Sequence, residues 1–143
     1  MKKTILWSLL GLMVCMLTFT ACSNDDDDNS ISCSTITGAW TIQSGTLDTN
    51  DNDSPAQTIN FKNDSSVIIT YADGTLDDRT NKWSLAGDSL RINWNIKNGV
   101  VDDYIIGKLS FSDNNTVTYT YTSHDGSGAW DSKDTKTIIL KKK

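Results

Sequence analysis

Residues 89–99 read SLRINWNIKNG, and no other stretch of the chain predicts a strand as clearly. Every second residue in the first part is apolar, namely Leu90, Ile92, Trp94 and Ile96. A period of two places these side chains on one face of a strand and the intervening polar residues on the other. The Asn98-Gly99 pair that follows is a strong signal for a tight turn. The stretch therefore predicts a strand with one face in a core and a chain reversal directly after it.

Other segments after Ser34 alternate in the same way, and none shows the 3.6-residue period of a helix. The predicted strands cover residues 37–44, 57–61, 67–71, 80–85, 89–97, 104–111, 116–122 and 136–141. Turn-forming sequences separate them. Eight short strands in sequence order predict an all-β fold, an eight-stranded antiparallel up-and-down barrel, which is wide enough to be packed or to hold one small ligand. A two-sheet β-sandwich is the alternative.

The first predicted strand carries Gly38-x-Trp40 within the sequence ITGAWTIQS. With this motif on the first of eight strands, residues 35–141 resemble the lipocalin-like domains of Bacteroides-type lipoproteins. The resemblance implies that Trp40 plugs the closed end of the barrel and that Gly38 lets the chain enter closely. The same three letters recur at Gly128-Ala129-Trp130 in a predicted loop, so context and not the motif alone carries the resemblance. Lipocalins usually bring an arginine from near the last strand across this tryptophan, whereas TKTIILKKK at the end of this chain holds only lysines.

The loops of an up-and-down barrel lie alternately at its two ends. The loops after the first, third, fifth and seventh predicted strands are long, and those between are tight turns, as in the open mouth and closed base of a lipocalin. Both chain ends are expected at the base, because the number of strands is even. The mouth loops hold eleven aspartates, at positions 48, 51, 53, 73, 77, 78, 102, 103, 125, 131 and 134. Arg79 and Lys133 are their only basic residues, so the sequence predicts an acidic mouth.

The candidate ligand-binding residues are aromatic. Those predicted to point inward are Trp40, Phe61, Tyr71, Trp83, Trp94, Tyr119 and Tyr121. They either form a plain core or line a pocket for an apolar ligand. Trp130 lies in a mouth loop, where it either covers the open end of the core or stacks on a sugar ring.

The chain has one histidine, His124, with Asp125 and Ser127 beside it. No G-x-S-x-G elbow supports a nucleophile there, so His124 is interpreted as a polar loop residue. No zinc set, phosphate loop or dinucleotide fingerprint occurs either. The sequence therefore predicts neither an enzyme nor a bound cofactor.

The segment DTNDNDS, residues 48–54, has the spacing of a calcium loop at Asp48, Asn50 and Asn52. Its sixth position holds Asp53 where such loops have glycine, and its twelfth holds Ile59 where they have glutamate. We therefore expect a solvated loop and no metal site.

The N-terminus reads as an export signal. Lys2 and Lys3 precede an apolar run from Ile5 to Phe19, which is shorter than the ~20 residues that a membrane-spanning helix needs. Phe19-Thr20-Ala21-Cys22 resembles the lipobox of bacterial lipoproteins. The resemblance implies cleavage after Ala21 and acyl chains such as palmitate on Cys22, which would anchor the protein in the outer membrane. An ordinary signal peptide with a chance cysteine is the alternative.

Residues 22–33 form the predicted tether between this anchor and a single domain, residues 34–143. Asp25–Asp28 resembles the export tag of surface lipoproteins in Bacteroides-type bacteria, which implies exposure on the cell surface. A solvated spacer that stays on the periplasmic face is the alternative. Cys33 is interpreted as an unpaired thiol in this linker, and a disulfide between two molecules is the other possibility.

Charge excludes one class of partner. Residues 1–21 hold two lysines and no acidic residue, so their removal changes the net charge from -5 to -7, and all 18 acidic residues are aspartates. Such a chain does not attract nucleic acid, and we expect a monomer. Three functions remain: a surface-tethered binder of a small hydrophobic or amphipathic molecule, a filled-barrel structural or protein-interaction module, and an accessory glycan binder using Trp130. An interior space larger than ~300 Å³ would favour the first.

Overall fold

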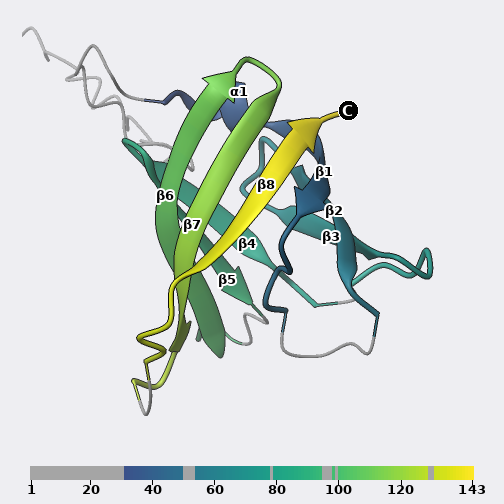
Figure 1. Cartoon of the computed structure of the whole chain (residues 1–143). Coiled ribbons are helices and arrows are strands. Elements are labelled where there is room, and N and C mark those ends of the chain that lie inside the picture. The colour runs from purple at the N-terminus through teal and green to yellow at the C-terminus, as the bar shows by residue number, and fades with distance from the viewer. Residues whose placement is uncertain (1–30, 50–53, 78, 95–97, 99, 129–130) are drawn as a thin grey trace, which may run out of the picture.

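The computed structural model describes residues 31–49, 54–77, 79–94, 98, 100–128 and 131–143. Within these ranges the chain forms one short helix and eight strands (Figure 1). Their bounds are α1 Cys33–Ile36, β1 Gly38–Ser44, β2 Ala56–Phe61, β3 Val67–Tyr71, β4 Lys82–Ala86, β5 Ser89–Trp94, β6 Asp103–Asp113, β7 Thr116–Asp125 and β8 Lys136–Lys142. No helix among these residues has the length and apolar character needed to cross a bilayer.

All eight strands belong to one antiparallel sheet with the order β3-β2-β1-β8-β7-β6-β5-β4. Except for β3 and β4, strands that follow one another in sequence are paired, and the pairing of β1 with β8 joins the first strand to the last. The sheet curls so that its two edge strands, β3 and β4, approach each other, as Figure 1 shows. The predicted eight-stranded barrel is confirmed, and the two-sheet sandwich is wrong because no second sheet forms among the described residues.

The two edge strands β3 and β4 meet along a line, called the seam below, where a few backbone contacts complete the barrel. An isolated bridge joins Ser66 to Lys82, and Trp83 donates its backbone N–H to the Ser65 carbonyl at 2.8 Å. Residues 75–77 fold back and hydrogen-bond to the rest of the β3 edge. The edge is thereby covered, which protects it from pairing with another chain, and the barrel is nearly closed.

The core follows from the alternation seen in the sequence. In β5 the residues Leu90, Ile92 and Trp94 are buried, and their neighbours are only partly covered. Burying one such side chain contributes roughly 1.5–3 kcal/mol. The largest fully buried side chains include Trp40, Phe61, Trp94, Tyr119 and Tyr121.

Gly107 allows β6 and β7 to approach closely. A Cβ atom at this position would lie 2.0 Å from the Thr120 carbonyl oxygen and 2.4 Å from the Tyr121 Cα. Any side chain would therefore collide with the backbone of the neighbouring strand. Glycine inside a strand often marks such a tight bend in a barrel.

One end of the barrel is sealed by α1, which the sequence did not predict. Trp40 donates its indole N–H to the Ile36 carbonyl at 2.6 Å. Lys142 lies with its Nζ atom 5.4 Å from the centroid of the Trp40 ring and donates to the Thr35 carbonyl at 3.2 Å. A lysine thus occupies the place across Trp40 where the lipocalin resemblance implies an arginine.

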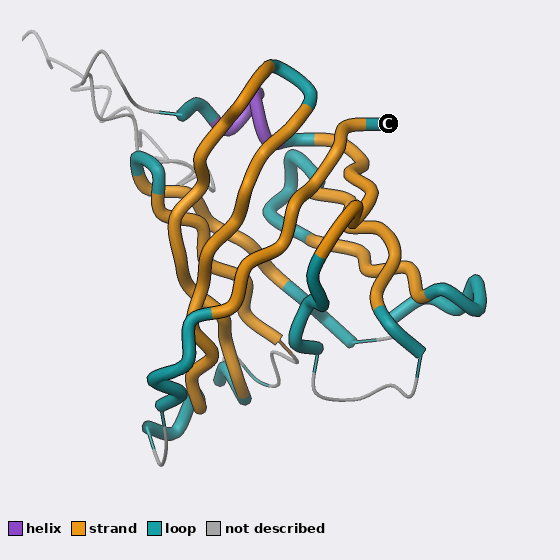
Figure 2. The backbone as a smooth tube through the Cα atoms, viewed as in Figure 1, coloured by secondary structure: helices purple, strands orange, loops and turns teal. Residues whose placement is uncertain are grey.

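The start of the described chain and its C-terminus lie at the same end of the barrel. Lys143 donates its backbone N–H to the Ala39 carbonyl at 3.0 Å. In Figure 2 the helix and the C-terminus share one end, whereas the loop between β7 and β8 lies at the other. The expectation that both chain ends leave from the base is confirmed for residues 31–143.

Two interpretations are corrected by the structure. β7 extends to Asp125, three residues beyond the predicted strand, so His124 lies on a strand and not in a loop. Cys33, the first residue of α1, is disulfide-bonded, so its interpretation as an unpaired thiol is wrong. The two other cysteines, Cys15 and Cys22, lie outside the described residues.

Candidate ligand site at the barrel mouth

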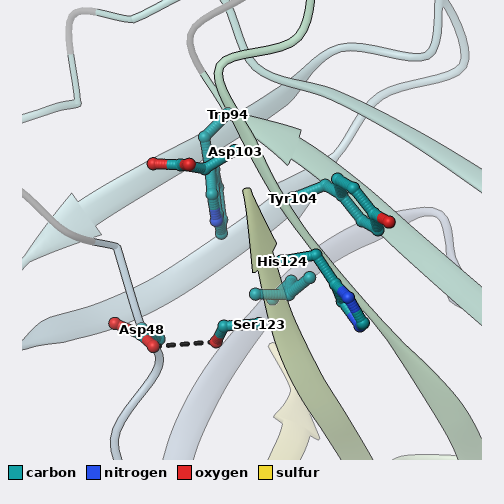
Figure 3. Close-up of a pocket in the computed structure, with 7 residues that line it drawn as sticks. Asp48, Trp94, Asp103, Tyr104, Ser123 and His124 are labelled. Carbon is teal, nitrogen blue, oxygen red and sulfur yellow. Dashed lines mark hydrogen bonds between the residues drawn. The ribbon is translucent and has the colours of Figure 1, made fainter. Parts of the chain in front are cut away.

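A narrow slot opens at the mouth end of the barrel, opposite the sealed base. Its polar lining comes from Asp48 after β1, Trp94 at the end of β5, Asp103 at the start of β6 and Ser123 near the end of β7. Figure 3 shows these four side chains on one side of the sheet. The inside of the slot has no room for a water molecule. A ligand group would therefore bind at its opening.

Asp48 is held in place by three contacts. Its Oδ2 atom accepts hydrogen bonds from the Ser123 hydroxyl at 2.8 Å and from Lys136 Nζ at 2.7 Å. Its backbone N–H donates to the Tyr121 hydroxyl oxygen at 3.0 Å. Burial raises the pKa of the Asp48 carboxyl, but the hydrogen bonds from Lys136 and Ser123 and the lysine charge outweigh burial and bring this pKa below its usual value. The carboxylate is thus ionised and fixed at neutral pH.

Two stacked tyrosines lie below Asp48. The rings of Tyr119 and Tyr121 are 5.0 Å apart at an interplanar angle of 24°. Tyr119 donates to the Leu90 carbonyl and Tyr121 to the Thr46 carbonyl, each at 3.0 Å. Burial raises the pKa of Tyr121 to about 12, and burial raises the pKa of Tyr119 further above its usual value. Both hydroxyls are therefore neutral and donate to the backbone. Tyr121 holds the β1–β2 loop against β7, and Tyr119 holds β5 against β7.

Trp94 differs from the other described tryptophans in the hydrogen bonding of its indole N–H. Trp40 donates to Ile36, and Trp83 donates to the Lys62 carbonyl at 3.0 Å. Trp94 is only 2% exposed, yet its N–H has no hydrogen-bond acceptor among the described residues. Every fully buried side-chain nitrogen or oxygen in that part of the chain has a partner. The Trp94 N–H therefore lies at the edge of the slot, where solvent reaches it.

A buried ion pair fills the mouth end of the seam. Arg79 donates from Nε to Asp77 Oδ1 at 2.8 Å and from Nη2 to Oδ2 at 2.6 Å, and the two side chains are 10% and 3% exposed. Asn81 donates to the same carboxylate at 3.0 Å. Burial raises the pKa of Asp77, but the hydrogen bonds and charge of Arg79 outweigh it, so this pKa lies below its usual value. Arg79, one of the two basic residues of the predicted mouth loops, is therefore buried and paired.

The same pair lies beside one residue of the slot lining, because the Arg79 guanidinium carbon is 5.7 Å from the centroid of the Trp94 ring. The remaining predicted aromatic residues lie deeper or nearer the base. Phe61 packs edge-on against Trp83 with the ring centroids 5.3 Å apart. Tyr71 points toward Asp77, with its hydroxyl 3.4 Å from that carboxylate. Of the predicted aromatic residues that the structure describes, only Trp94 lines the slot.

His124 projects from the opposite face of the sheet, as Figure 3 shows. Its ring stacks on Tyr104 at 4.8 Å, and the Arg91 guanidinium lies 3.7 Å from the other side of Tyr104. The Nδ1 atom of His124 is 2.7 Å from an Asp131 carboxylate oxygen. Ser127 donates instead to Asp125. The rings of His124 and Tyr104 thus form a stack on the outer face, although both residues also contribute to the lining of the slot.

Several predicted residues cannot be placed. Trp130, Asn50, Asn52 and Asp53 lie outside the described residues, so the glycan and calcium hypotheses are not decided there. Within the described ranges, no group of three or more histidine, cysteine or acidic side chains is arranged to hold a metal ion.

Sequence reasoning missed Ser123 and Lys136 as neighbours of the site. The alternation of TYTYTS does place Ser123 inward with Tyr119 and Tyr121, and this was the available signal. Lys136 could not be found in this way, because it is 88 residues from Asp48 in the sequence.

No protein-family model matches the chain, and no curated protein sequence matches it significantly. One solved structure, described as "Structure of EF1p2_mFAP2b bound to DFHBI", is 15% identical over 77% of this chain and 95% of that chain, with a TM-score of 0.43. At this identity and TM-score the likeness extends no further than the general fold.

Proposed function

We propose that this chain is a lipid-tethered, lipocalin-like binding protein that holds a small amphipathic molecule at the acidic mouth of its barrel. One observation carries the proposal, namely the difference between the two ends. The base is sealed by α1 and by Lys142 over Trp40. The mouth has a slot with a tryptophan N–H, a serine hydroxyl and the carboxylates of Asp48 and Asp103.

The mouth also exposes apolar side chains that fit the other half of an amphipathic molecule. Leu76 is 63% exposed and Val100 is 64% exposed. Leu76 lies between β3 and β4, and Val100 lies between β5 and β6, so both belong to mouth loops. Exposed large apolar side chains at a polar rim are a feature of ligand and partner sites.

Charge selects among such molecules. The described mouth loops carry aspartates at positions 48, 73, 77, 102, 103, 125, 131 and 134. Arg79 is neutralised by Asp77, and Lys136 is bound to Asp48. An anion entering the mouth is repelled, so neutral and cationic amphiphiles bind better than fatty acids.

The proposed anchor agrees with this orientation. α1 begins at Cys33, at the end of the tether and at the base, so acyl chains on Cys22 place the mouth away from the membrane. In that processed form Cys33 has no cysteine left in its own chain to pair with, so the proposal confines its disulfide to the unprocessed chain. Residues 23–33 reach at most ~36 Å when extended. The domain therefore stays close to the membrane surface, and its mouth faces the medium.

Titration of the full chain with 1-decanol, decylamine and decanoate tests the proposal by isothermal calorimetry. We expect decanol and decylamine to bind more tightly than decanoate at 10 mM salt. The difference should shrink in 150 mM salt, where exposed charges are screened over ~8 Å. Tighter binding of decanoate at low salt would contradict the electrostatic argument, and no binding by any probe would contradict the proposed function.

A filled-barrel structural or protein-interaction module is the second candidate. Two observations favour it. The inward aromatic side chains Trp40, Phe61 and Tyr119 have no exposed surface. The slot has no room for a water molecule, whereas ligand pockets usually exceed ~300 Å³. The same titration separates the two functions, because this module binds none of the three probes.

A further inference from the structure

We propose that the base of the barrel is a docking surface for an anionic membrane, whose lipid phosphates contact the lysine side chains gathered there. The inference deepens the proposed function, because it rests on the lipid tether and names the kind of lipid surface that the tethered domain faces. It is carried by the way in which charge divides between the two ends of the barrel.

Lysine side chains gather at the base. Lys62 follows the last residue of β2, which pairs with Gly38 at the start of β1. Lys82 opens β4 and is bridged to the β2–β3 turn. Lys141 pairs with Thr116 directly after the β6–β7 turn, and Figure 1 shows this turn at the same end as α1 and the C-terminus. The complete set is Lys62, Lys82, Lys108, Lys141, Lys142 and Lys143.

The two ends of the barrel carry net charges of opposite sign. Among the described residues the six lysines of the base stand against three aspartates, which leaves +3. The described mouth loops hold eight aspartates against three basic residues, which leaves −5. The base aspartates are Asp64, Asp88 and Asp113, and the basic residues of the mouth are Arg79, Lys133 and Lys136.

The acidic mouth is too far away to cancel an attraction at the base. β7 runs from the base to the mouth with ten residues, which span roughly 30 Å at ~3.3 Å per residue. Exposed charges are screened over ~8 Å at physiological ionic strength. A membrane at the base therefore meets the local positive charge, although the chain as a whole is acidic.

The base lysines are accessible to lipid phosphates. Lys62, Lys141 and Lys143 are exposed. Lys108 lies 3.0 Å from Asp88, but its side chain is 76% exposed, and such a surface pair is weak enough for a phosphate to replace the carboxylate. A lysine ammonium binds phosphate as a point charge, and each one near an anionic membrane strengthens binding about fivefold.

The tether makes a membrane the expected occupant of this surface. α1 begins at Cys33 at the base, so acyl chains on Cys22 enter the bilayer within ~36 Å of it. Tethering converts docking into an intramolecular step at high effective concentration, so a few lysine–phosphate contacts suffice. A soluble anion gains nothing from the tether.

Binding of the full chain to vesicles, measured by sedimentation, tests the docking surface. The vesicles are phosphatidylcholine alone, or phosphatidylcholine with an equal part of phosphatidylglycerol. Lys62→Gln should weaken binding to the anionic vesicles about fivefold and leave binding to the neutral ones unchanged. Lys133→Gln is the matched control, because it removes the same charge from an exposed lysine of the mouth, and it should bind like the wild type. The apolar run from Ile5 to Phe19 is present in every protein, so its contribution to vesicle binding cancels in these ratios.

Acetylation of the wild type with acetic anhydride, followed by mass spectrometry, gives a measurement that needs no variant. On anionic vesicles Lys62 and Lys141 should react more slowly than in solution, whereas Lys133 should react equally in both. Neutral vesicles should protect none of the three.

Three results would overturn the docking surface. They are no preference of the wild type for anionic vesicles, equal weakening by Lys62→Gln and Lys133→Gln, and a preference that emerges only after Asp25–Asp28 are replaced by asparagine. The last result would mean that the acidic tether itself occupies the base. The titration with decanol, decylamine and decanoate decides the proposed function separately, so failure of the one is distinguishable from failure of the other.

Discussion

Replacement of Asp77 by asparagine should test how the seam of the barrel is held closed. β3 and β4 share an isolated bridge and a few backbone bonds at one end. At the mouth end the Asp77–Arg79 pair fills the space between them, with both side chains at least nine-tenths buried. Asparagine keeps the size of the side chain but leaves the Arg79 guanidinium without its ionised partner.

The expected loss is large compared with the total stability. Breaking a buried ion pair by removing one partner costs about 3–5 kcal/mol, whereas a domain of this size is stable by roughly 5–15 kcal/mol. Asp77→Asn should therefore shift the urea midpoint downward by about 2–3 M, for a slope of about 1.5 kcal/mol/M. The double variant Asp77→Asn/Arg79→Met removes the uncompensated charge and should recover at least half of the loss.

The pH dependence gives an independent check with a fixed sign. The pKa of Asp77 in the folded protein lies below its ordinary value of 3.8. A depressed carboxyl pKa stabilises the folded state above the unfolded pKa, and this stability is lost as the pH falls through the folded pKa. The difference between wild type and Asp77→Asn should be constant from pH 5 to 7 and shrink below about pH 4. A loss under ~0.5 kcal/mol at pH 7, or a difference that grows in acid, would refute the role of the pair.

Four further changes test the base, the bend, the anchor and the export tag. Lys142→Ala should lower the melting temperature by about 2–4 °C, since an exposed cation–π contact contributes ~0.5–1 kcal/mol, and Lys142→Arg should not. Gly107→Ala should destabilise the barrel by more than ~2 kcal/mol by chemical denaturation, because its Cβ would lie 2.0 Å from a carbonyl oxygen. Cys22→Ala should release the protein from the membrane fraction; an unchanged distribution would contradict lipidation. Replacing Asp25–Asp28 by alanine should keep lipidation and reduce cleavage by external protease, and unchanged cleavage would contradict the export tag.

The barrel could be predicted because the residue pattern that specifies each strand lies within a short stretch of sequence. Alternation in each strand depends on neighbouring residues, and β3 was predicted with its observed bounds, 67–71. The helix α1 could not be predicted, because four residues are too few to show a 3.6-residue period. His124 was wrongly assigned to a loop, because the pairing that places it on a strand does not show in its own sequence neighbourhood. Its polar neighbours are typical of a loop, but pairing with Tyr104 on β6 extends the strand through it.

The candidate site depends on contacts that no local pattern contains. Alternation correctly placed Trp94 inside the barrel, but it could not show that this tryptophan, unlike Trp40 and Trp83, finds no acceptor for its N–H. That difference arises because the partners come from distant segments, as in the bond between Asp48 and Ser123, which are 75 residues apart. The same ring also lies beside Arg79 of the seam. Trp94 therefore connects the contact that closes the barrel to the lining of the slot.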